Sequence, residues 1–231
     1  MKKMWKTDKE LFEFARKELF TAVVGDVMDK VGLCQQFLPP QIRPLSPEMV
    51  VVGRAMTVLE ADVFSETDGG RVNRRLQQPF GLMLEALDDL KPNEVYICTG
   101  SSPRYALWGE LMSTRAIRLG AVGAVVDGYS RDSKGILRLK FPTFSYGGYA
   151  QDTSVRGKVI DFRTPLQIGQ VRVVTQDIVF GDIDGVCVVP SRAAQEVFTR
   201  ALEKVRGEKT VQKALQNGMC ARRAFAKYGI M

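Results

Sequence analysis

Two acidic residues and an arginine stand at a spacing that could bind a small acid together with a metal ion. Glu110 begins a segment of helical pattern, and the dipeptide Arg131-Asp132 follows an apolar run. Carboxylates are hard oxygen ligands for a divalent cation. The arginine side chain offers a planar fork of N–H donors that matches a carboxylate or a developing enolate oxygen. This set would suit a 2-oxo acid held with a metal ion.

The elements between these residues indicate how they could meet. The pattern predicts a helix over 109–119 that ends at a glycine cap, Gly120, and a buried strand over 122–127. Such a helix is about 16 Å long and such a strand about 20 Å, so the chain returns to the beginning of the helix. We therefore expect Glu110 to approach Arg131 and the residue after it.

The beginning of that helix could itself bind an anion. The N–H groups near Gly109, Leu111 and Met112 have no partner within the helix and could hold a substrate carboxylate. An ordinary structural role is also open for the charged residues. An Arg-Asp dipeptide after a strand is commonly a surface ion pair, and a glutamate in a first helical turn interacts favourably with the helix dipole.

The sequence contains no histidine, which restricts its chemistry. A Ser-His-Asp triad, a Cys-His pair and histidine-ligated zinc are excluded. The four cysteines lie far apart without a C-x-x-C motif, so we expect structural thiols. Acid–base chemistry must use carboxylates, Lys, Tyr, Cys or metal-bound water, and a metal site with oxygen ligands favours Mg²⁺ or Mn²⁺.

Length and composition are typical of a globular protein. The chain has 231 residues, of which 45% are hydrophobic and 26% charged, and we expect a single domain over 1–231 with a helical C-terminal tail from about 191 to 231. No apolar run approaches the ~20 residues of a membrane span, and we see no secretion signal, so a soluble cytoplasmic protein is expected. The net charge is +7, and the excess of basic residues falls on 200–231. We expect this tail to pack on a neighbouring subunit rather than on nucleic acid.

The pattern of the whole chain predicts an α/β protein. Helices are predicted over 7–20, 22–31, 79–89, 191–206 and about 209–226, and further strands over 50–59, 94–99, 141–146, 157–162, 170–175 and 185–189. A long polar loop covers 62–78 and carries Arg71, Arg74 and Arg75. Such a loop either shapes specificity or is a solvated insertion.

Several short motifs, in this order, resemble those of the RraA-like family. Trp108-Gly109-Glu110 is similar to the family's W-G-[DE], and twenty residues separate this acid from Arg131-Asp132, as in the family's aldolases. The stretch from Gly120 to Asp132 is similar to its G-x-x-G-x-V-x-D-G-x-x-R-D segment. Residues 21–26 resemble its T-A-x-x-x-D motif, and residues 181–190 resemble its G-D-x-D-G-V…P turn, for which we expect turn formation rather than metal ligation.

The resemblance implies a fold and a chemistry. The fold would be the swivelling β/β/α type, assembled as homotrimers or homohexamers. Asp132 would coordinate Mg²⁺ or Mn²⁺ directly and Glu110 through water, while Arg131 would hold the 2-oxo acid and stabilise its enolate. The activity would be cleavage of a 4-hydroxy-2-oxo dicarboxylic acid to pyruvate, with oxaloacetate decarboxylation through the same enolate. The alternative is a non-catalytic regulator that binds a ribonuclease.

Overall fold

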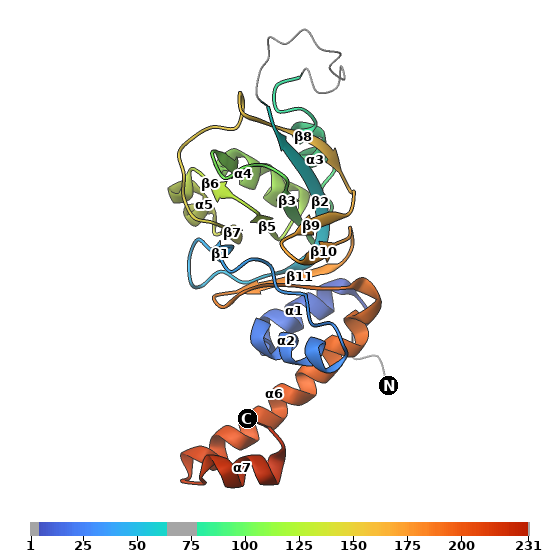
Figure 1. Ribbon diagram of the computed structural model, residues 1–231, viewed down its shortest axis with the longest axis vertical. Helices are drawn as coiled ribbons and strands as arrows, with labels where there is room; N and C mark the ends of the chain where they lie inside the picture. Colours follow the sequence, from blue (N-terminus) through green and yellow to red (C-terminus); the bar gives the residue numbers. More distant parts are fainter. Residues whose placement is uncertain (1–4, 64–77, 231) are drawn as a thin grey trace.

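The computed structural model describes residues 5–63 and 78–230. Most of the predicted polar loop, including its three arginines, lies outside these residues. Helices and short strands alternate through the first two thirds of the described chain, and two helices end it (Figure 1). The helices are α1 (Asp8–Glu18), α2 (Thr21–Lys30), α3 (Met83–Asp88), α4 (Glu110–Leu119), α5 (Ser133–Leu139), α6 (Ala194–Gln216) and α7 (Ala221–Tyr228). The strands are β1 (Arg43–Pro44), β2 (Val51–Asp62), β3 (Glu94–Thr99), β4 (Ala106–Trp108), β5 (Gly123–Val126), β6 (Tyr129–Ser130), β7 (Thr143–Ser145), β8 (Gly157–Phe162), β9 (Leu166–Ile168), β10 (Val171–Val173), β11 (Ile178–Asp182) and β12 (Gly185–Val189).

A mixed sheet forms the centre of the molecule. Its strand order is β1-β7-β5-β3-β2-β11-β12, with β8 also pairing with β2. The strands β2, β3, β5 and β7 run parallel, while β11 and β8 are antiparallel to β2. The long strand β2 is therefore paired along one edge by β3, and along the other edge first by β11 and then by β8. β2 therefore joins the parallel strands β3, β5 and β7 to the antiparallel strands β8 and β11.

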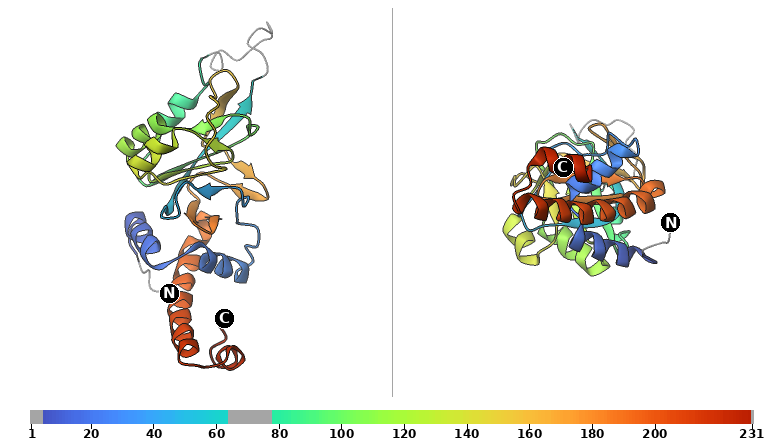
Figure 2. Two further views of the ribbon diagram at one scale, coloured as in Figure 1. Left: turned by 90° about the vertical axis from the view of Figure 1, so that its left-hand side faces the viewer. Right: turned by 90° about the horizontal axis from the view of Figure 1, so that it is seen from below.

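Helices cover one face of the sheet and a small hairpin covers the other. Apolar side chains of α3, α4 and α5 pack with those of β3 and β5 in one buried cluster. The β9–β10 hairpin covers the other face of the sheet. It packs in a second cluster with the β3 side chains that point to that face, including Val95 and Ile97. Figure 2 shows the three helices on one side of the strands. This arrangement is the α/β class that the sequence predicts.

The N-terminal helices pack at the β11–β12 end of the sheet. A third buried cluster joins α1, α2 and the first part of α6 to side chains of β11 and β12, such as Phe180 and Cys187. Thr7 caps α1, and its hydroxyl accepts the amide hydrogen of Glu10 at 3.2 Å. The N-terminal helix that the capping pattern predicts is therefore present.

The C-terminal tail differs from the prediction of two helices with a break near 207. α6 runs without interruption from Ala194 to Gln216 and ends before Gly218, which has a φ of 87°. Gly207 is accommodated inside α6, where a Cβ atom would meet the side chain of Ile230. The distal part of α6 and α7 extend away from the sheet (Figures 1 and 2). No helix of the described residues combines the length and the apolar character that crossing a membrane requires.

α3 begins later than the sequence predicts. The predicted helix covers 79–89, whereas the observed helix begins at Met83. Phe80 and Gly81 have φ values of 66° and 63°, which a right-handed helix cannot contain. The chain instead turns there, and the amide of Gly81 donates to the carbonyl of Gln78. This turn places Phe80 and α3 beside the candidate site described next.

Candidate active site

A short parallel strand pair brings the two halves of the predicted site together. β4 lies beside β6, and the amide of Arg131 donates to the carbonyl of Trp108 at 2.8 Å. The amide nitrogen of Glu110 lies 3.4 Å from Oδ2 of Asp132. Residues 22 positions apart in the sequence thus meet at the beginning of α4.

Trp108 anchors this end of α4. Its indole is 1% exposed and packs on the ring of Tyr96, with 4.9 Å between ring centroids. The indole N–H donates to the hydroxyl of Ser113 at 2.7 Å, and that hydroxyl donates to the carbonyl of Gly109 at 3.0 Å. The first turn of the helix is therefore fixed by buried hydrogen bonds.

Gly109 lets the carboxylate of Asp132 approach the backbone. A Cβ atom at position 109 would lie 2.8 Å from Oδ2 of Asp132, so a side chain there would displace the carboxylate. Asp132 itself has a left-handed conformation, with φ 56° and ψ 34°. This conformation is uncommon for a residue with a side chain and is often found at functional sites. This backbone conformation places the carboxylate of Asp132 beside the beginning of α4.

The side chain of Glu110 turns toward α5. Its Oε1 atom accepts from the guanidinium of Arg138 at 3.1 Å, and its carboxylate packs against Gly135. The backbone of Glu110 therefore lies at the predicted site, whereas its carboxylate contacts the neighbouring helix. Its predicted contact with a metal ion through water stays a prediction.

Arg131 is held by two carboxylates. Its Nη1 atom donates to Oδ1 of Asp152 at 2.7 Å, and its Nε atom lies 3.6 Å from Oδ2 of Asp132. Hydrogen bonds from Ser154 and the charge of Arg131 hold the pKa of Asp152 below its usual range. Sequence reasoning missed Asp152, because nothing in the segment around it indicates a contact with Arg131.

A pocket of about 260 Å³ opens at these residues. It is smaller than the ~300–1,000 Å³ of pockets for drug-sized ligands, and this size suits a small organic acid. Gly109, Leu111 and Met112 line it, so the first turn of α4 borders the same space as Arg131 and Asp132. We call it the Arg131 pocket, and its described lining is Phe80, Met83, Leu84, Leu87, Ala106, Leu107, Trp108, Gly109, Leu111, Met112, Arg131, Asp132, Asp152 and Thr153.

The donor set of this pocket fits a hydrated divalent cation. Within residues 5–63 and 78–230, no three side chains of the metal-ligating types His, Cys, Asp and Glu cluster together. The side chain of Asp132 lines the pocket and is 44% exposed, which leaves its oxygens accessible. Mg²⁺ commonly binds one or two carboxylates and keeps several waters. Asp132 therefore fits such an ion, although a closed cage of protein ligands is not built.

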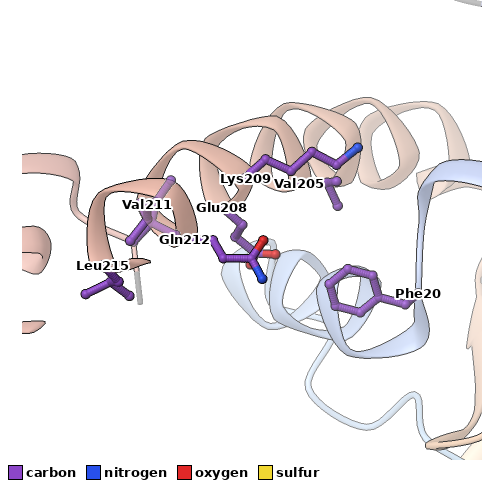
Figure 3. A pocket seen from close by; sticks show the side chains of 8 residues that line it. Phe20, Val205, Glu208, Lys209, Val211, Gln212 and Leu215 are labelled. Carbon is purple, nitrogen blue, oxygen red and sulfur yellow. The ribbon is translucent and has the colours of Figure 1, made fainter. Parts of the chain in front are cut away.

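A second pocket, of about 470 Å³, lies far from this chemistry, between the beginning of α2 and α6 (Figure 3). It is lined mainly by apolar side chains, namely Phe20, Val205, Val211, Leu215 and Ile230. Of its charged lining residues, Lys209 pairs with Glu18 and Glu208 with Lys204. This pocket is an apolar crevice beside the tail, and the Arg131 pocket remains the candidate active site.

Comparison with known proteins identifies relatives over most of the chain. A profile of the RraA-like family, described as Aldolase/RraA, matches residues 21–188. A Halalkalibacterium halodurans protein named "Putative 4-hydroxy-4-methyl-2-oxoglutarate aldolase" is 28% identical over 207 residues, which are 89% of each chain. The protein DlpA of Legionella pneumophila is 26% identical over 208 residues. These residues are 90% of this chain, but the chain spans only about a third of the length of DlpA.

A solved structure shows the same fold. The crystal structure of RraAS2 from Streptomyces coelicolor, described as an unusual member of the RNase ES inhibitor RraA protein family, aligns with a TM-score of 0.77. The alignment covers 90% of this chain and all of that one at 21% identity. The architecture described above is thus the RraA-like fold.

Proposed function

The chain belongs to the RraA-like family, and from this premise we propose that it is a divalent-metal-dependent carbon–carbon lyase. Its substrate would be a 4-hydroxy-2-oxo acid, cleaved to pyruvate and an aldehyde or ketone. The dicarboxylic acids expected from the sequence are one group of these compounds, and oxaloacetate decarboxylation would use the same site. The name of the Halalkalibacterium relative, "Putative 4-hydroxy-4-methyl-2-oxoglutarate aldolase", supports the proposal of a carbon–carbon lyase. The observation that carries it is the placement of Arg131 beside Asp132 in one small pocket.

The proposed cleavage breaks the C3–C4 bond of the substrate. The C4 hydroxyl gives its proton to water at the pocket mouth, C4 becomes a carbonyl, and the electron pair moves into the enolate of pyruvate. Water then returns a proton to C3. Asp132, with Glu110 through water, would hold a divalent cation, and that cation would supply Lewis-acid polarisation of the 2-oxo group.

The residues of the chain hold the substrate and stabilise developing charge. The amides at the first turn of α4, near Leu111 and Met112, would bind the substrate carboxylate. The guanidinium of Arg131 would face the 2-oxo oxygen, which gains negative charge as the bond breaks. Asp152 holds this guanidinium at 2.7 Å and so fixes its direction. The positive charge that would stabilise the developing enolate oxygen would then be oriented before the substrate binds.

The experiment measures pyruvate release from oxaloacetate and from 4-hydroxy-4-methyl-2-oxoglutarate. The protein is stripped with EDTA and assayed with and without Mg²⁺ or Mn²⁺. We expect turnover that depends on the metal and is lost in Asp132→Ala. The control is Asp29→Ala, which removes an exposed carboxylate on α2, and it should retain activity. Equal activity of Asp132→Ala and the unchanged protein would contradict the proposed site.

The alternative proposal is a regulator that binds a ribonuclease without catalysis. RraAS2, with the same fold, is described as a member of an RNase ES inhibitor family. A pull-down with a ribonuclease of this type distinguishes the two proposals. Binding that is unchanged in Asp132→Ala, together with no turnover of any 2-oxo acid, would favour the regulator.

A further inference from the structure

The Arg131 pocket divides into a charged part and an apolar part. The charged and polar side chains of its described lining belong to loops after β6 and before β8, namely Arg131, Asp132, Asp152 and Thr153. Phe80 and the α3 residues Met83, Leu84 and Leu87 form a lining without charge. We call these four residues the α3 wall. A ligand that fills the pocket must meet both parts.

The described lining offers one cation. That cation is Arg131, which already faces the carboxylates of Asp132 and Asp152. A metal ion at Asp132 and the amides of the first turn of α4 would bind the 2-oxo group and the adjacent carboxylate, which lie at one end of the ligand. A second carboxylate at the other end would find no positive partner on the α3 wall. Placing a charge on an apolar surface without a partner is costly.

The apolar part of the pocket reaches buried side chains. Leu87 is 6% exposed, Leu107 2% and Trp108 1%, although all three contribute to the lining. Leu84 and Leu111 are 54% and 83% exposed and lie toward solvent. The lining therefore passes from open side chains to a buried apolar floor. Such a floor gains from covering apolar atoms and penalises charged ones.

Resting on the proposed lyase function, we infer that the substrate carries an apolar substituent at C4. Its general formula is R–CH(OH)–CH2–CO–COO⁻, with R an alkyl or aryl group seated on the α3 wall. Cleavage of the C3–C4 bond transfers the proton of the C4 hydroxyl to water, releases R–CHO and leaves pyruvate after C3 takes a proton from water. The charged end of this substrate lies at Arg131. The preferred compounds are monocarboxylates rather than dicarboxylates.

A matched pair of inert ligands tests this preference by binding. The compounds 2-oxoglutarate and 5-methyl-2-oxohexanoate have the same shape, with a carboxylate in one replaced by an isopropyl group in the other. Neither has a C4 hydroxyl, so neither can be cleaved. Binding is followed through the change in tryptophan fluorescence of the full chain with Mg²⁺, since Trp108, one of its two tryptophans, lines the pocket. We expect the apolar ligand to bind at least about tenfold more tightly. Equal binding, or tighter binding of 2-oxoglutarate, overturns the inference.

A charge placed on the α3 wall provides the second test. Leu84→Arg adds a cation at an exposed position of the lining and should shift the binding preference toward 2-oxoglutarate by about fivefold or more. Ile117→Arg is the control, since Ile117 is 42% exposed on α4 and does not belong to the described lining. It should leave the preference unchanged. An equal shift in both variants would mean a general effect of charge and would contradict the placement of the substituent.

A turnover assay separates this inference from the proposed function. 4-Hydroxy-2-oxopentanoate and 4-hydroxy-2-oxoglutarate differ in a methyl or a carboxylate at C4, and we expect the first to have the higher kcat/KM. Faster cleavage of the dicarboxylate would overturn the apolar preference and leave the lyase standing. If neither compound is cleaved while 5-methyl-2-oxohexanoate binds more tightly than 2-oxoglutarate, the proposed lyase activity is rejected. The inferred preference of the pocket for an apolar ligand is then retained.

Discussion

At the residue scale, Gly135 leaves room for the carboxylate of Glu110 beside α5. A Cβ atom at position 135 would overlap the carboxylate that pairs with Arg138. Alanine is favoured over glycine inside a helix by about 1 kcal/mol. We therefore expect Gly135→Ala to gain little stability, because the gain in helix propensity is offset by displacing Glu110.

A double-mutant cycle measures this effect. Urea unfolding is compared for Gly135→Ala, for Glu110→Ala and for the double variant. With Glu110 shortened, the alanine at 135 meets no carboxylate and should stabilise the protein by up to about 1 kcal/mol. The packing argument is wrong if alanine at 135 has the same effect in both backgrounds.

A second residue-scale prediction concerns the pH dependence of stability. Glu60 on β2 is 5% exposed, and burial raises its pKa from 4.5 to about 8, against the opposing effect of a hydrogen bond with Cys98. Between these two values the folded chain keeps a proton that the unfolded chain has released. The free energy of unfolding therefore falls as the pH rises from 4.5 to 8 and loses nothing more above 8. The loss is up to about 5 kcal/mol, since one pKa unit is about 1.4 kcal/mol.

The variant Glu60→Gln removes this titration. We expect it to be more stable than the unchanged protein at pH 8.5 and to gain little at pH 5, as measured by urea unfolding at both values. Glu85→Gln, at an exposed position of α3, is the control and should leave the pH slope unchanged. Parallel pH profiles for Glu60→Gln and the unchanged protein would rule out this buried carboxyl as the cause.

Some residues of the site could be predicted from the sequence and others could not. The approach of Arg131 and Asp132 to the beginning of α4 follows from the helix and strand lengths. It is observed in the structure, where these residues contact Trp108 and the amide of Glu110. The direction of the Glu110 carboxylate depends on α5, which the sequence pattern did not indicate. The contact of Asp152 with Arg131 joins loops that no local pattern connects. Tertiary packing, rather than periodicity, decides both.

At the element scale, Asp182 ties α2 to the β11–β12 hairpin. Its carboxylate accepts from the amide of Thr21 at 2.7 Å, from the hydroxyl of Thr21 at 2.7 Å and from the amide of Asp184 at 2.9 Å. Asp182 therefore stabilises the turn between β11 and β12 and caps the beginning of α2, which lies far away in the sequence. The turn role expected for this motif agrees with these contacts.

We predict that Asp182→Ala destabilises the fold. It leaves two buried donors of Thr21 and the partly buried amide of Asp184 without this acceptor, and the expected loss is about 2–4 kcal/mol. The measurement is the midpoint of thermal or urea unfolding. Asp184→Ala, which removes a more exposed carboxylate from the same turn, should cost less than about 1 kcal/mol. Similar losses in the two variants would contradict the capping role of Asp182.

The predictability of the elements follows the strength of their local signals. The strands over 94–99, 157–162 and 185–189 appear with the predicted bounds, because apolar runs there end at clear turn residues. The sequence did not reveal β4, β6 and β9, which are short, or β11, which lies beside a turn-rich stretch. α3 is shortened by the left-handed residues Phe80 and Gly81. Such backbone conformations are set by packing against β8 rather than by composition.

At the scale of the whole molecule, we propose that the tail contributes to a homotrimer or homohexamer. The distal part of α6 and α7 extend from the body (Figure 1). They carry an aromatic side chain, Phe225, that is 57% exposed. The apolar crevice between Phe20 and Leu215 opens beside them (Figure 3). Exposed apolar surface of this kind is commonly covered by a partner.

Sedimentation equilibrium tests this assembly. We expect a mass of three or six chains at micromolar concentration, and weaker association in Phe225→Asp because a charge replaces an apolar contact. Asn217→Asp is the control, since it changes the charge of the tail equally at another exposed position. A monomer for the unchanged protein, or equal weakening by both variants, would contradict an interface at α7.

The double pairing of β2 has a consequence for synthesis on the ribosome. β3 can join one edge of β2 early, but the other edge must wait for β8 and β11, which end at Phe162 and Asp182. Translation proceeds at about 5–20 residues per second, so a strand completed at Asp62 would wait roughly 5 to 25 s. During that interval the nascent chain presents a long apolar strand with an open edge, which is the kind of surface that chaperones protect from association.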